Sequence, residues 1–316
     1  MMLLLGATGY IGTAFWAALR QRGEKFTTLS RSQVDYTRFQ PLYEFLKEHR
    51  PSFIINAAGY TGKPNVDACE TAKADTLQGN ALFPQTLAQV CAILDIPWGH
   101  VSSGCIFAGC QVETANGWVV EKDMTLPMVR ELAANSPAKL RGFDETMPPN
   151  FTFRDPPCSF YSGTKALGEE AIRDVGRCYI WRLRIPFDQI DNSRNYLSKI
   201  QRYAKVYDNL NSLSHRADFA NACLDSWSQQ IPFGTYNVTN PGFISTAKVV
   251  AMIKDILKPK RDFSFWENDA DFYSQGAVAL RSNCIMDTTK LRQAGIIVRQ
   301  VEQAVESALV SWTAQP

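Results

Sequence analysis

The feature that most constrains this 316-residue chain is the glycine-rich turn that follows an apolar run at its amino terminus. Met1 to Leu5 is apolar, Gly6-Ala7-Thr8-Gly9-Tyr10-Ile11-Gly12 comes next, and Thr13 to Arg22 has the pattern of an amphipathic helix that stops at Gly23. A strand, a tight turn and a helix in this order are typical of a parallel α/β sheet that binds a nucleotide. The glycines let the backbone approach a pyrophosphate, whose charge is stabilised at the helix N-terminus.

We therefore predict that the turn binds a cofactor, and the alternative is a glycine-rich turn without a ligand. The predicted contacts come from Gly6, Thr8, Gly9, Tyr10, Ile11 and Gly12.

The end of the next strand, Lys25 to Leu29, indicates which cofactor is bound. It leads into Ser30-Arg31, where a protein specific for NAD often has Asp or Glu to hold the ribose hydroxyls. A guanidinium bonds a 2′-phosphate in a fork, so we expect NADP(H) to be preferred, with NAD(H) as the second choice. The alternative is that Arg31 begins a solvated loop and Asp35 serves the adenosine side.

Apolar runs alternate with helical segments along most of the chain, which predicts an α/β fold with a doubly wound parallel sheet. The expected strands are 1–5, 25–29, 51–59, 96–102, 178–185 and 234–238, and the expected helices are 13–22, 41–48, 79–94, 161–175, 246–257, 287–294 and 301–312. We assign residues 1–185 and 212–244 to the cofactor domain, and residues 186–211 and 245–316 to a smaller C-terminal substrate-binding lobe. Residues 110–157 break the rhythm and form either a partly helical connection, around 128–134, or a substrate-side lid.

Small residues end the third of these strands, at Asn56-Ala57-Ala58. At the carboxyl end of a parallel strand they leave room for a ligand in the crevice, so we add Asn56, Ala57 and Ala58 to the cofactor contacts.

Composition narrows the partners. A net charge of +2 argues against a protein that binds a phosphate backbone, so we expect no nucleic acid. The first strand begins at Met1 or Met2 and no apolar run approaches the ~18 residues of a membrane span, so we expect a cytoplasmic protein without membrane contact. The eight cysteines are scattered without a C-x-x-C pair, which predicts reduced thiols and no metal site.

The candidate chemistry centres on the stretch from Val101 to Phe107, in which Ser103 and Cys105 would share one face of a strand. Tyr161 and Lys165 lie four residues apart and share one face of a predicted helix. A nearby ammonium lowers the pKa of a phenol, and Ser103 adds a second hydroxyl, so this trio is able to bind and protonate a ketone oxygen that receives hydride. The alternative is that Tyr161-x-x-x-Lys165 is an exposed helical turn.

Seven further stretches, in order along nearly the whole chain, carry a resemblance to a known family. They are Asn56-Ala-Ala-Gly-Tyr-Thr-Gly-Lys-Pro-Asn-Val-Asp-Ala-Cys-Glu70, Ser102-Ser-Gly-Cys-Ile-Phe107, Ser159-Phe-Tyr-Ser-Gly-Thr-Lys-Ala166, Leu183-Arg-Ile-Pro186, Ser193-Arg-Asn-Tyr-Leu-Ser-Lys-Ile200, Tyr236-Asn-Val-Thr-Asn-Pro-Gly242 and Arg281-Ser-Asn-Cys-Ile-Met-Asp-Thr-Thr-Lys-Leu291. The chain resembles the extended short-chain dehydrogenase/reductases, and within them the branch of dTDP-4-dehydrorhamnose reductase and the bifunctional 3,5-epimerase/4-reductases of nucleotide-rhamnose synthesis. The resemblance implies a Rossmann fold.

The central stretch indicates which of these activities to expect. Reductase-only members resemble a Thr-Asp-Tyr-Val-Phe version of it, whereas bifunctional members have a cysteine at the position of Cys105 and pair it with a lysine, matched here by Lys199. The resemblance therefore implies epimerisation as well as reduction of a nucleotide-linked 4-keto-6-deoxyhexose, and we expect UDP as the nucleotide. Without it, Cys105 would be a small core residue and Lys199 a surface lysine.

The resemblance also implies that Arg281 binds the substrate diphosphate and that Asn195 orders the same region, with a structural salt bridge as the alternative for Arg281. Members commonly form homodimers through the helix after the third strand and the Tyr161 helix. Two departures bear on the sugar and the nucleotide: the segment from 110 to 150 is longer than expected, and no proline follows Arg281.

Two other functions fit the same residues. One is a 4-reductase that acts on an already epimerised sugar, with Cys105 as a packing residue. The other is a non-catalytic NADP-binding subunit similar to the regulatory subunit of methionine adenosyltransferase, against which Ser103, Tyr161 and Lys165 argue because a binding module does not need them.

Overall fold

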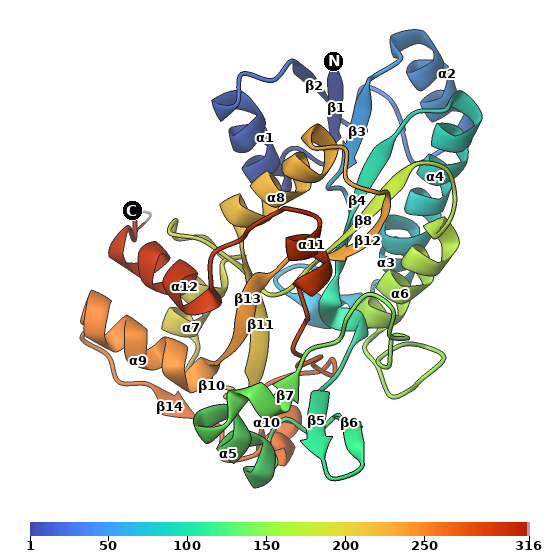
Figure 1. Ribbon diagram of the computed structural model, residues 1–316. Helices are drawn as coiled ribbons and strands as arrows, with labels where there is room; N and C mark the ends of the chain where they lie inside the picture. The colour runs from blue at the N-terminus through green and yellow to red at the C-terminus, as the bar shows by residue number, and fades with distance from the viewer. Residues whose placement is uncertain (315–316) are drawn as a thin grey trace.

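A six-stranded parallel sheet forms the centre of the computed structural model, which describes residues 1–314 (Figure 1). Its strand order is β2-β1-β3-β4-β8-β12, and the strands are β1 (Met2–Leu5), β2 (Phe26–Leu29), β3 (Phe53–Asn56), β4 (Trp98–Ser103), β8 (Cys178–Leu183) and β12 (Gly234–Asn237). Strands β1, β3 and β8 are buried along their whole length, as helices on both faces of a parallel sheet require. The order reverses between β1 and β3, which opens a crevice at their carboxyl ends.

Helices cover both faces of this sheet, which confirms the doubly wound arrangement. On one face, α1 (Gly12–Gln21) packs against α8 (Arg216–Ser228). On the other face lie α2 (Phe39–His49), α4 (Phe83–Leu94) and α6 (Phe160–Ile172), as Figure 1 shows. The helix expected over residues 79–94 consists of α4 and a preceding π-helical turn, Gln78–Leu82, that follows the short helix α3 (Lys73–Leu77).

A second, three-stranded sheet lies beside the first. Its order is β13 (Asn240–Ser245), β11 (Leu210–His215) and β9 (Pro186–Phe187). Its apolar core is shared with α7 (Tyr196–Arg202), α9 (Thr246–Leu257) and α12 (Val301–Val310). The shorter elements of this part are β10 (Lys205–Val206), β14 (Ser264–Phe265), α10 (Asp269–Gln275) and α11 (Thr289–Gln293). Residues 315 and 316, which the expected substrate lobe includes, lie outside the described residues.

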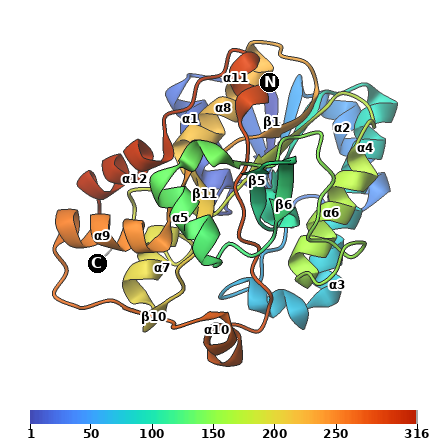
Figure 2. The ribbon, with the colours of Figure 1, turned by 60° about the horizontal axis from the view of Figure 1, so that its bottom comes forward.

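The segment from 110 to 157 has regular structure. Strands β5 (Cys110–Thr114) and β6 (Gly117–Glu121) form an antiparallel hairpin, β7 (Leu140–Arg141) pairs with β5, and α5 (Pro127–Asn135) lies where a helix was expected. A small apolar core joins the hairpin to α5. Figure 2 shows this substructure in front when the lower end of the molecule is turned toward the viewer.

Several elements were not expected from the sequence, among them α8 and the strands β11 and β13. The buried face of α8 consists largely of small residues, including Ala220, Ala222 and Cys223, and also buries Ser226, so its apolar pattern is weak. Strand β11 buries polar residues that bond across its sheet, so it lacks the alternation that marks a strand. None of the helices within residues 1–314 is long and apolar enough to span a membrane.

Candidate functional site

The glycine turn after β1 is tight because two of its glycines have no room for a side chain. Gly6 has a φ of +74°, and a Cβ there would lie 2.5 Å from the backbone nitrogen of Ala58. A Cβ on Gly12 would overlap the carbonyl oxygen of Gly6. The Gly9 amide donates to that carbonyl at 3.0 Å, while Thr8 and Gly9 remain exposed to an approaching ligand. The turn therefore forms a close-fitting cradle at the crevice between β1 and β3.

The Asn56-Ala57-Ala58 segment is held against this turn. The Ala57 amide donates to the carbonyl of Leu5 at 3.0 Å, and the Ala58 amide donates to the side-chain oxygen of Asn56 at 3.0 Å. Asn56 is buried and also bonds His100, whose pKa burial lowers well below its usual value, so His100 is neutral and structural. The structure thus brings together the two cofactor segments expected from the sequence.

Ser30 and Arg31 lie at the end of β2, which is the neighbour of β1. The Ser30 hydroxyl bonds Ser32 at 2.8 Å and Gln33 at 2.9 Å. Arg31 is exposed and belongs to none of the ion pairs within residues 1–314. Asp35, the alternative residue, is also exposed and accepts from the Thr37 hydroxyl. Both candidates therefore lie on the surface, in the segment that follows β2.

Tyr10 connects the turn to the second sheet. The Arg216 guanidinium lies 4.0 Å from the centroid of the Tyr10 ring and pairs with Asp188 at 2.6 Å. Asp188 in turn accepts from the side chain of Asn195, at 3.0 Å. This chain of contacts links the cofactor turn to the helix that carries Lys199.

Ser103 and Cys105 are adjacent in space, although they do not share a strand as expected. Strand β4 ends at Ser103, whose hydroxyl accepts from the Cys105 amide at 3.2 Å and starts a 3-10 turn, Gly104–Ile106. A side-chain oxygen that captures the next free amide is a typical way to end a strand and begin a helical turn. Cys105 therefore projects from the turn above the strand end, with 6% of its surface exposed.

Tyr161 and Lys165 lie on α6 beside this turn, but burial controls their protonation. Burial raises the pKa of the Tyr161 phenol, and the Ser103 hydroxyl and the Arg184 charge act in the opposite direction. The Lys165 ammonium donates to the carbonyl of Val101 at 3.0 Å, and burial lowers its pKa. The expectation that Lys165 brings the pKa of Tyr161 toward neutrality is thus not met in this structure, because desolvation of the phenolate outweighs the nearby charges.

Cys105 is buried among polar groups. Burial raises the pKa of its thiol, whereas the hydroxyls of Ser103 and Ser162 and the charges of Arg184 and Lys165 favour the thiolate. The surrounding groups therefore oppose the effect of burial without overcoming it.

Helix α6 is fixed in place from both ends. The Phe160 amide at its start donates to Glu70 at 2.8 Å. Near its end, Glu169 pairs with Arg182 of β8 at 2.7 Å, with both side chains 1% exposed. Glu169 also accepts from the hydroxyl of Ser102 at 2.5 Å. Tyr161 and Lys165 are thereby held in register with the end of β4.

Lys199 lies on α7, in a cationic environment. Burial lowers its pKa, and the positive charges of Arg194 and Arg281 lower it further. Asn195 caps α7 by accepting from the Leu197 amide at 3.0 Å, so it orders this region as expected. The positive charge of Arg194 also lowers the pKa of the Cys69 thiol, whereas a negative charge on Cys105 would raise it. Lys199 therefore lies near Arg194 and Arg281, on a different element from Cys105.

Arg281 forms a two-pronged ion pair with Asp67, with N···O distances of 2.8 and 2.9 Å. Its backbone amide donates to the Tyr273 hydroxyl at 3.1 Å. The salt bridge that was the alternative for Arg281 thus exists, and it leaves the guanidinium 22% exposed.

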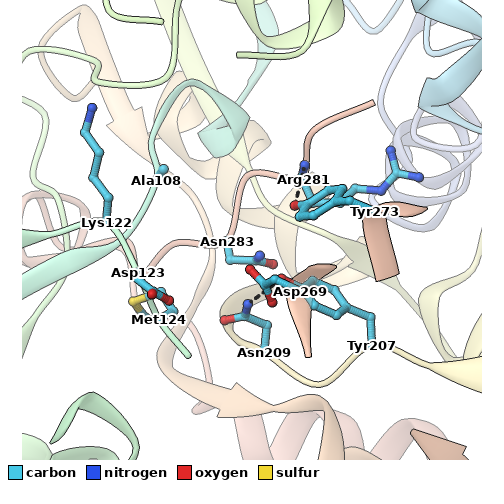
Figure 3. Close-up of a pocket in the computed structure, with 10 residues that line it drawn as sticks. All are labelled: Ala108, Lys122, Asp123, Met124, Tyr207, Asn209, Asp269, Tyr273, Arg281 and Asn283. Atoms are coloured by element: carbon cyan, nitrogen blue, oxygen red, sulfur yellow. Dashed lines mark hydrogen bonds between the residues drawn. The ribbon is translucent and has the colours of Figure 1, made fainter. Parts of the chain in front are cut away.

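A cavity of about 260 Å³ adjoins Arg281 (Figure 3). One wall comes from the segment after β6, with Lys122 and Asp123, and the other from Tyr207, Tyr273 and Arg281. Figure 3 shows the Arg281 guanidinium directed away from the cavity, past Tyr273. The remaining lining residues are Ala108, Met124, Asn209, Asp269 and Asn283.

Sequence reasoning did not single out Arg184, Asp67 or Glu169, although each belongs to a stretch described above or follows one closely. Asp67 and Glu70 lie in the long Asn56–Glu70 stretch, and Arg184 lies in Leu183–Pro186. The available signal was position, because Arg184 lies at the carboxyl end of the predicted strand 178–185, at the sheet edge where ligands bind. The spacing Lys165-x-x-x-Glu169 likewise indicated a shared helix face.

Comparison with known proteins identifies the family. Residues 1–131 match the family described as RmlD substrate binding domain. The bifunctional dTDP-4-dehydrorhamnose 3,5-epimerase/dTDP-4-dehydrorhamnose reductase of Arabidopsis thaliana is 32% identical over 293 residues, which cover 92% of this chain and 86% of the relative. The chain spans only 38–39% of the length of longer, trifunctional Arabidopsis relatives.

Two solved structures share the fold. The L780 UDP-rhamnose synthase of Acanthamoeba polyphaga mimivirus has a TM-score of 0.81 at 23% identity, covering 98% of each chain. A dTDP-4-dehydrorhamnose reductase of Bacillus anthracis, solved in complex with NADP, has a TM-score of 0.74 at 19% identity, covering 98% of this chain and 96% of that one. Taken with the Arabidopsis relative, these matches mean that the chain belongs to the dTDP-4-dehydrorhamnose reductase-like branch of the extended short-chain dehydrogenase/reductase family.

Proposed function

We propose that this protein is an NADPH-dependent nucleotide-sugar epimerase/reductase that converts an NDP-4-keto-6-deoxyhexose, UDP-linked, into an NDP-L-rhamnose-type sugar. The observation that carries the proposal is the cluster of Ser103, Cys105, Tyr161 and Lys165 at the carboxyl end of β4. The printed names of the relatives, which include a bifunctional epimerase/reductase and a UDP-rhamnose synthase, support the same activity.

The cofactor proposal rests on the glycine cradle. A Cβ at Gly6 would collide with the backbone of Ala58, and one at Gly12 with the backbone of Gly6, so only glycines let the turn close tightly at the sheet edge where a pyrophosphate binds. Exposed Arg31, with Ser30 beside it, suits a 2′-phosphate, and a reductase of the same fold binds NADP. NADPH is therefore the proposed cofactor, with NADH as the second choice. When bound, it supplies the hydride for reduction at C4.

In the reductive step, Tyr161 is the proposed proton donor to the C4 oxygen and Ser103 the proposed hydrogen-bond partner that orients it. The raised pKa of Tyr161 suits this role, because the phenol keeps its proton at neutral pH until negative charge develops on the oxygen. Lys165 is the proposed positioning residue, through its bond to the carbonyl of Val101.

In the epimerising step, the protons at C3 and C5 are acidified because the carbanion delocalises onto the C4 oxygen, beside Ser103 and Tyr161. Inversion requires a base on one face of the ring and an acid on the other. Cys105 and Lys199 are the proposed pair, since the thiol lies within the cluster and the ammonium has a pKa lowered toward the working range.

The nucleotide end of the substrate is assigned to the cavity of Figure 3. Tyr207 and Tyr273 offer aromatic surface, and Asn209, Asp269 and Asn283 offer the polar groups that fix the orientation of a base. Arg194, Lys199 and Arg281 carry more positive charge than Asp67 balances, which suits a diphosphate between the base and the sugar.

The proposal includes a homodimer in the cytoplasm. All eight cysteines are free thiols, which fits a reducing compartment. Exposed apolar side chains on and beside α4 and α6, namely Leu82, Ile93 and Leu167, suit a helical dimer interface.

The test is to supply UDP- and dTDP-linked 4-keto-6-deoxyglucose with NADPH in deuterated water. We expect deuterium at C3 and C5 of the product and a hydroxyl at C4. Reduction without deuterium at either carbon would reject the epimerase half and leave the reductase half in place.

A variant separates the two halves further. Cys105→Ser should lower deuterium incorporation at least ~100-fold, the usual contribution of a proton-transfer residue, while reduction of an already epimerised sugar continues. Full epimerisation by this variant would favour the second candidate, a 4-reductase in which Cys105 is a packing residue. The near-complete burial of Cys105 is the observation that favours that candidate. A non-catalytic NADP-binding subunit, the third candidate, would bind the cofactor but turn over neither sugar.

A further inference from the structure

The side chain of Arg184 is a buried cation without a counterion. The residue is 6% exposed, yet it belongs to none of the ion pairs found within residues 1–314. One of its terminal nitrogens donates to the side-chain oxygen of Asn211 at 2.6 Å and to the carbonyl of Ser282, and both acceptors are neutral. Its Nε is buried and has no partner at all.

A neighbouring residue shows how unusual this is. Arg182, two positions earlier and within β8, is 1% exposed and has the carboxylate of Glu169 at 2.7 Å. Burial of an ionised group is expensive unless a charge of opposite sign accompanies it, and guanidinium does not escape by losing its proton. The missing counterion of Arg184 therefore suits a negative charge that forms nearby only during function.

The register of the sheet shows where that negative charge would lie. Leu183 pairs with Ser103 across β8 and β4, so Arg184 follows at the level of the turn that carries Cys105. Cys284 lies near both. Its thiol donates to the carbonyl of Gly104 at 3.3 Å, and it lies in the same apolar cluster as Cys105. Its backbone amide donates to the side-chain oxygen of Asn211, which also accepts from Arg184. The Arg184 charge also favours the anionic form of both thiols.

Building on the proposed function, we propose that Arg184 is a positioning residue for the epimerisation, whose fixed charge supplies the counterion of the Cys105 thiolate. The thiolate takes the proton from C3 or C5, becoming a thiol while the electron pair moves onto the C4 oxygen. In this role Arg184 acts on the sugar only through Cys105, by raising the fraction of Cys105 that is ionised.

Other groups also surround Cys105, but they do not replace Arg184. Cys69, Cys158 and Tyr161 gain negative charge when they ionise, so they oppose a thiolate. Lys165 favours it, but burial lowers the pKa of Lys165 and its ammonium is bonded to Val101 and lies near Glu169. An arginine stays charged throughout the working pH range, which makes Arg184 the lasting cation of the cluster.

The test is the pH dependence of Cys105 ionisation in the protein without substrate. Alkylation of the Cys105 peptide by iodoacetamide is followed by mass spectrometry, and absorbance at 240 nm is compared between each protein and its Cys105→Ala counterpart, which requires no access of reagent. We expect Arg184→Gln to move the ionisation of Cys105 to higher pH by roughly one unit or more, the usual effect of losing a nearby opposite charge. In Arg184→Lys, Cys105 should ionise at a pH between those of the wild type and of Arg184→Gln.

A second variant keeps the arginine. Asn211→Asp places a carboxylate where Arg184 now meets an amide oxygen, and the side chain of Asn283 is able to rotate and donate to it. Asn211→Asp should move the ionisation of Cys105 to higher pH, as Arg184→Gln is expected to do. It therefore tests the proposal even if Arg184→Gln fails to fold. Ser214→Ala is the matched control. It removes the bonds of the Ser214 hydroxyl to the Arg184 backbone amide and to the carbonyl of Val238 but changes no charge, so it should leave the ionisation of Cys105 unchanged.

An unaltered Cys105 profile in Asn211→Asp would overturn the proposal. Because the profile is measured without substrate, it is independent of whether the wild-type protein epimerises a sugar. A shifted profile in a protein that incorporates no deuterium would therefore refute the proposed function and leave the counterion role of Arg184 standing.

Discussion

At the scale of single residues, burial shifts the pKa values of Tyr161 and Lys165 in opposite directions. The two residues lie four positions apart, on one face of α6. Burial raises the pKa of the phenol and lowers that of the ammonium, so each group is shifted toward its neutral form. A neutral phenol is a proton donor, which fits the reduction of a ketone better than a phenolate does.

Tyr161→Phe tests this role. It removes the donor and keeps the ring, so we expect hydride transfer to fall by roughly 10²- to 10⁴-fold, the usual range for a general acid. The measurement is NADPH oxidation with an already epimerised sugar, with the thermal unfolding midpoint as the control for folding. Undiminished NADPH oxidation would exclude Tyr161 as the donor.

The pH dependence of the epimerising step follows from Cys105. Burial raises the pKa of its thiol, so the thiolate is the minor form at neutral pH. Below the pKa its fraction rises about tenfold per pH unit, so deuterium incorporation at C3 and C5 should increase from pH 7 to pH 9. The increase should become less steep where Lys199, whose pKa burial lowers, begins to lose its proton. The rate is measured with NADP⁺ in place of NADPH, which prevents reduction; equal rates at the two pH values would show that Cys105 is not the titrating base.

Sequence motifs were sufficient to group Ser103, Cys105, Tyr161 and Lys165, because each lies at a strand end or on a helix face that the pattern itself predicts. They were not sufficient for Arg184 or for the pKa of Tyr161. The meaning of Arg184 depends on the lack of a carboxylate around it, and the pKa depends on how far the phenol is desolvated; both are properties of packing between distant segments.

At the scale of elements, the contact between α6 and β8 decides whether the catalytic helix stays in register. Glu169 on α6, Arg182 on β8 and Ser102 on β4 form one buried network. Removal of one partner from a buried ion pair leaves an uncompensated charge and costs roughly 3–5 kcal/mol.

Glu169→Gln should accordingly lower the free energy of unfolding by about that amount, measured by urea denaturation. Glu170→Gln is the matched control: it removes the next carboxylate on the same helix, which pairs with Arg154 at 2.5 Å on the surface. An exposed pair contributes about 1 kcal/mol or less, so the control should unfold almost as the wild type does. Similar losses in the two variants would mean that the buried network does not hold α6.

An element was predictable from the sequence when its buried side chains form a clear apolar pattern. Strands β1, β3 and β8 are apolar throughout and α1 has a strong apolar stripe, so the sequence pattern identifies them. Helix α8 was missed because alanine, cysteine and serine pack against α1 there, and small residues give little contrast between the two faces of a helix.

At the scale of the whole molecule, the glycine cradle and the proposed nucleotide cavity come from different substructures, and the catalytic cluster connects them. The segment between β6 and α5 forms one wall of the cavity through Lys122, Asp123 and Met124. Residues 110–157, which the sequence left open between a helical connection and a lid, thus contribute to the surface around the proposed substrate. The division of the chain into a cofactor domain and a substrate lobe stays a prediction.

The last prediction concerns assembly. Ile93 is 61% exposed and Leu167 is 40% exposed, on two helices that pack side by side on the same face of the sheet. Apolar side chains gathered on adjacent helices mark an interaction surface, and a second copy of the chain covers it in the proposed dimer. Light scattering should therefore give twice the mass of one chain for the wild type, and mainly the mass of one chain for the Ile93→Glu, Leu167→Glu double variant.

Ile297→Glu is the control, because Ile297 is 77% exposed but lies after α11, away from α4 and α6. A wild type that scatters as a monomer, or a control that dissociates like the double variant, would argue against this surface as the dimer interface.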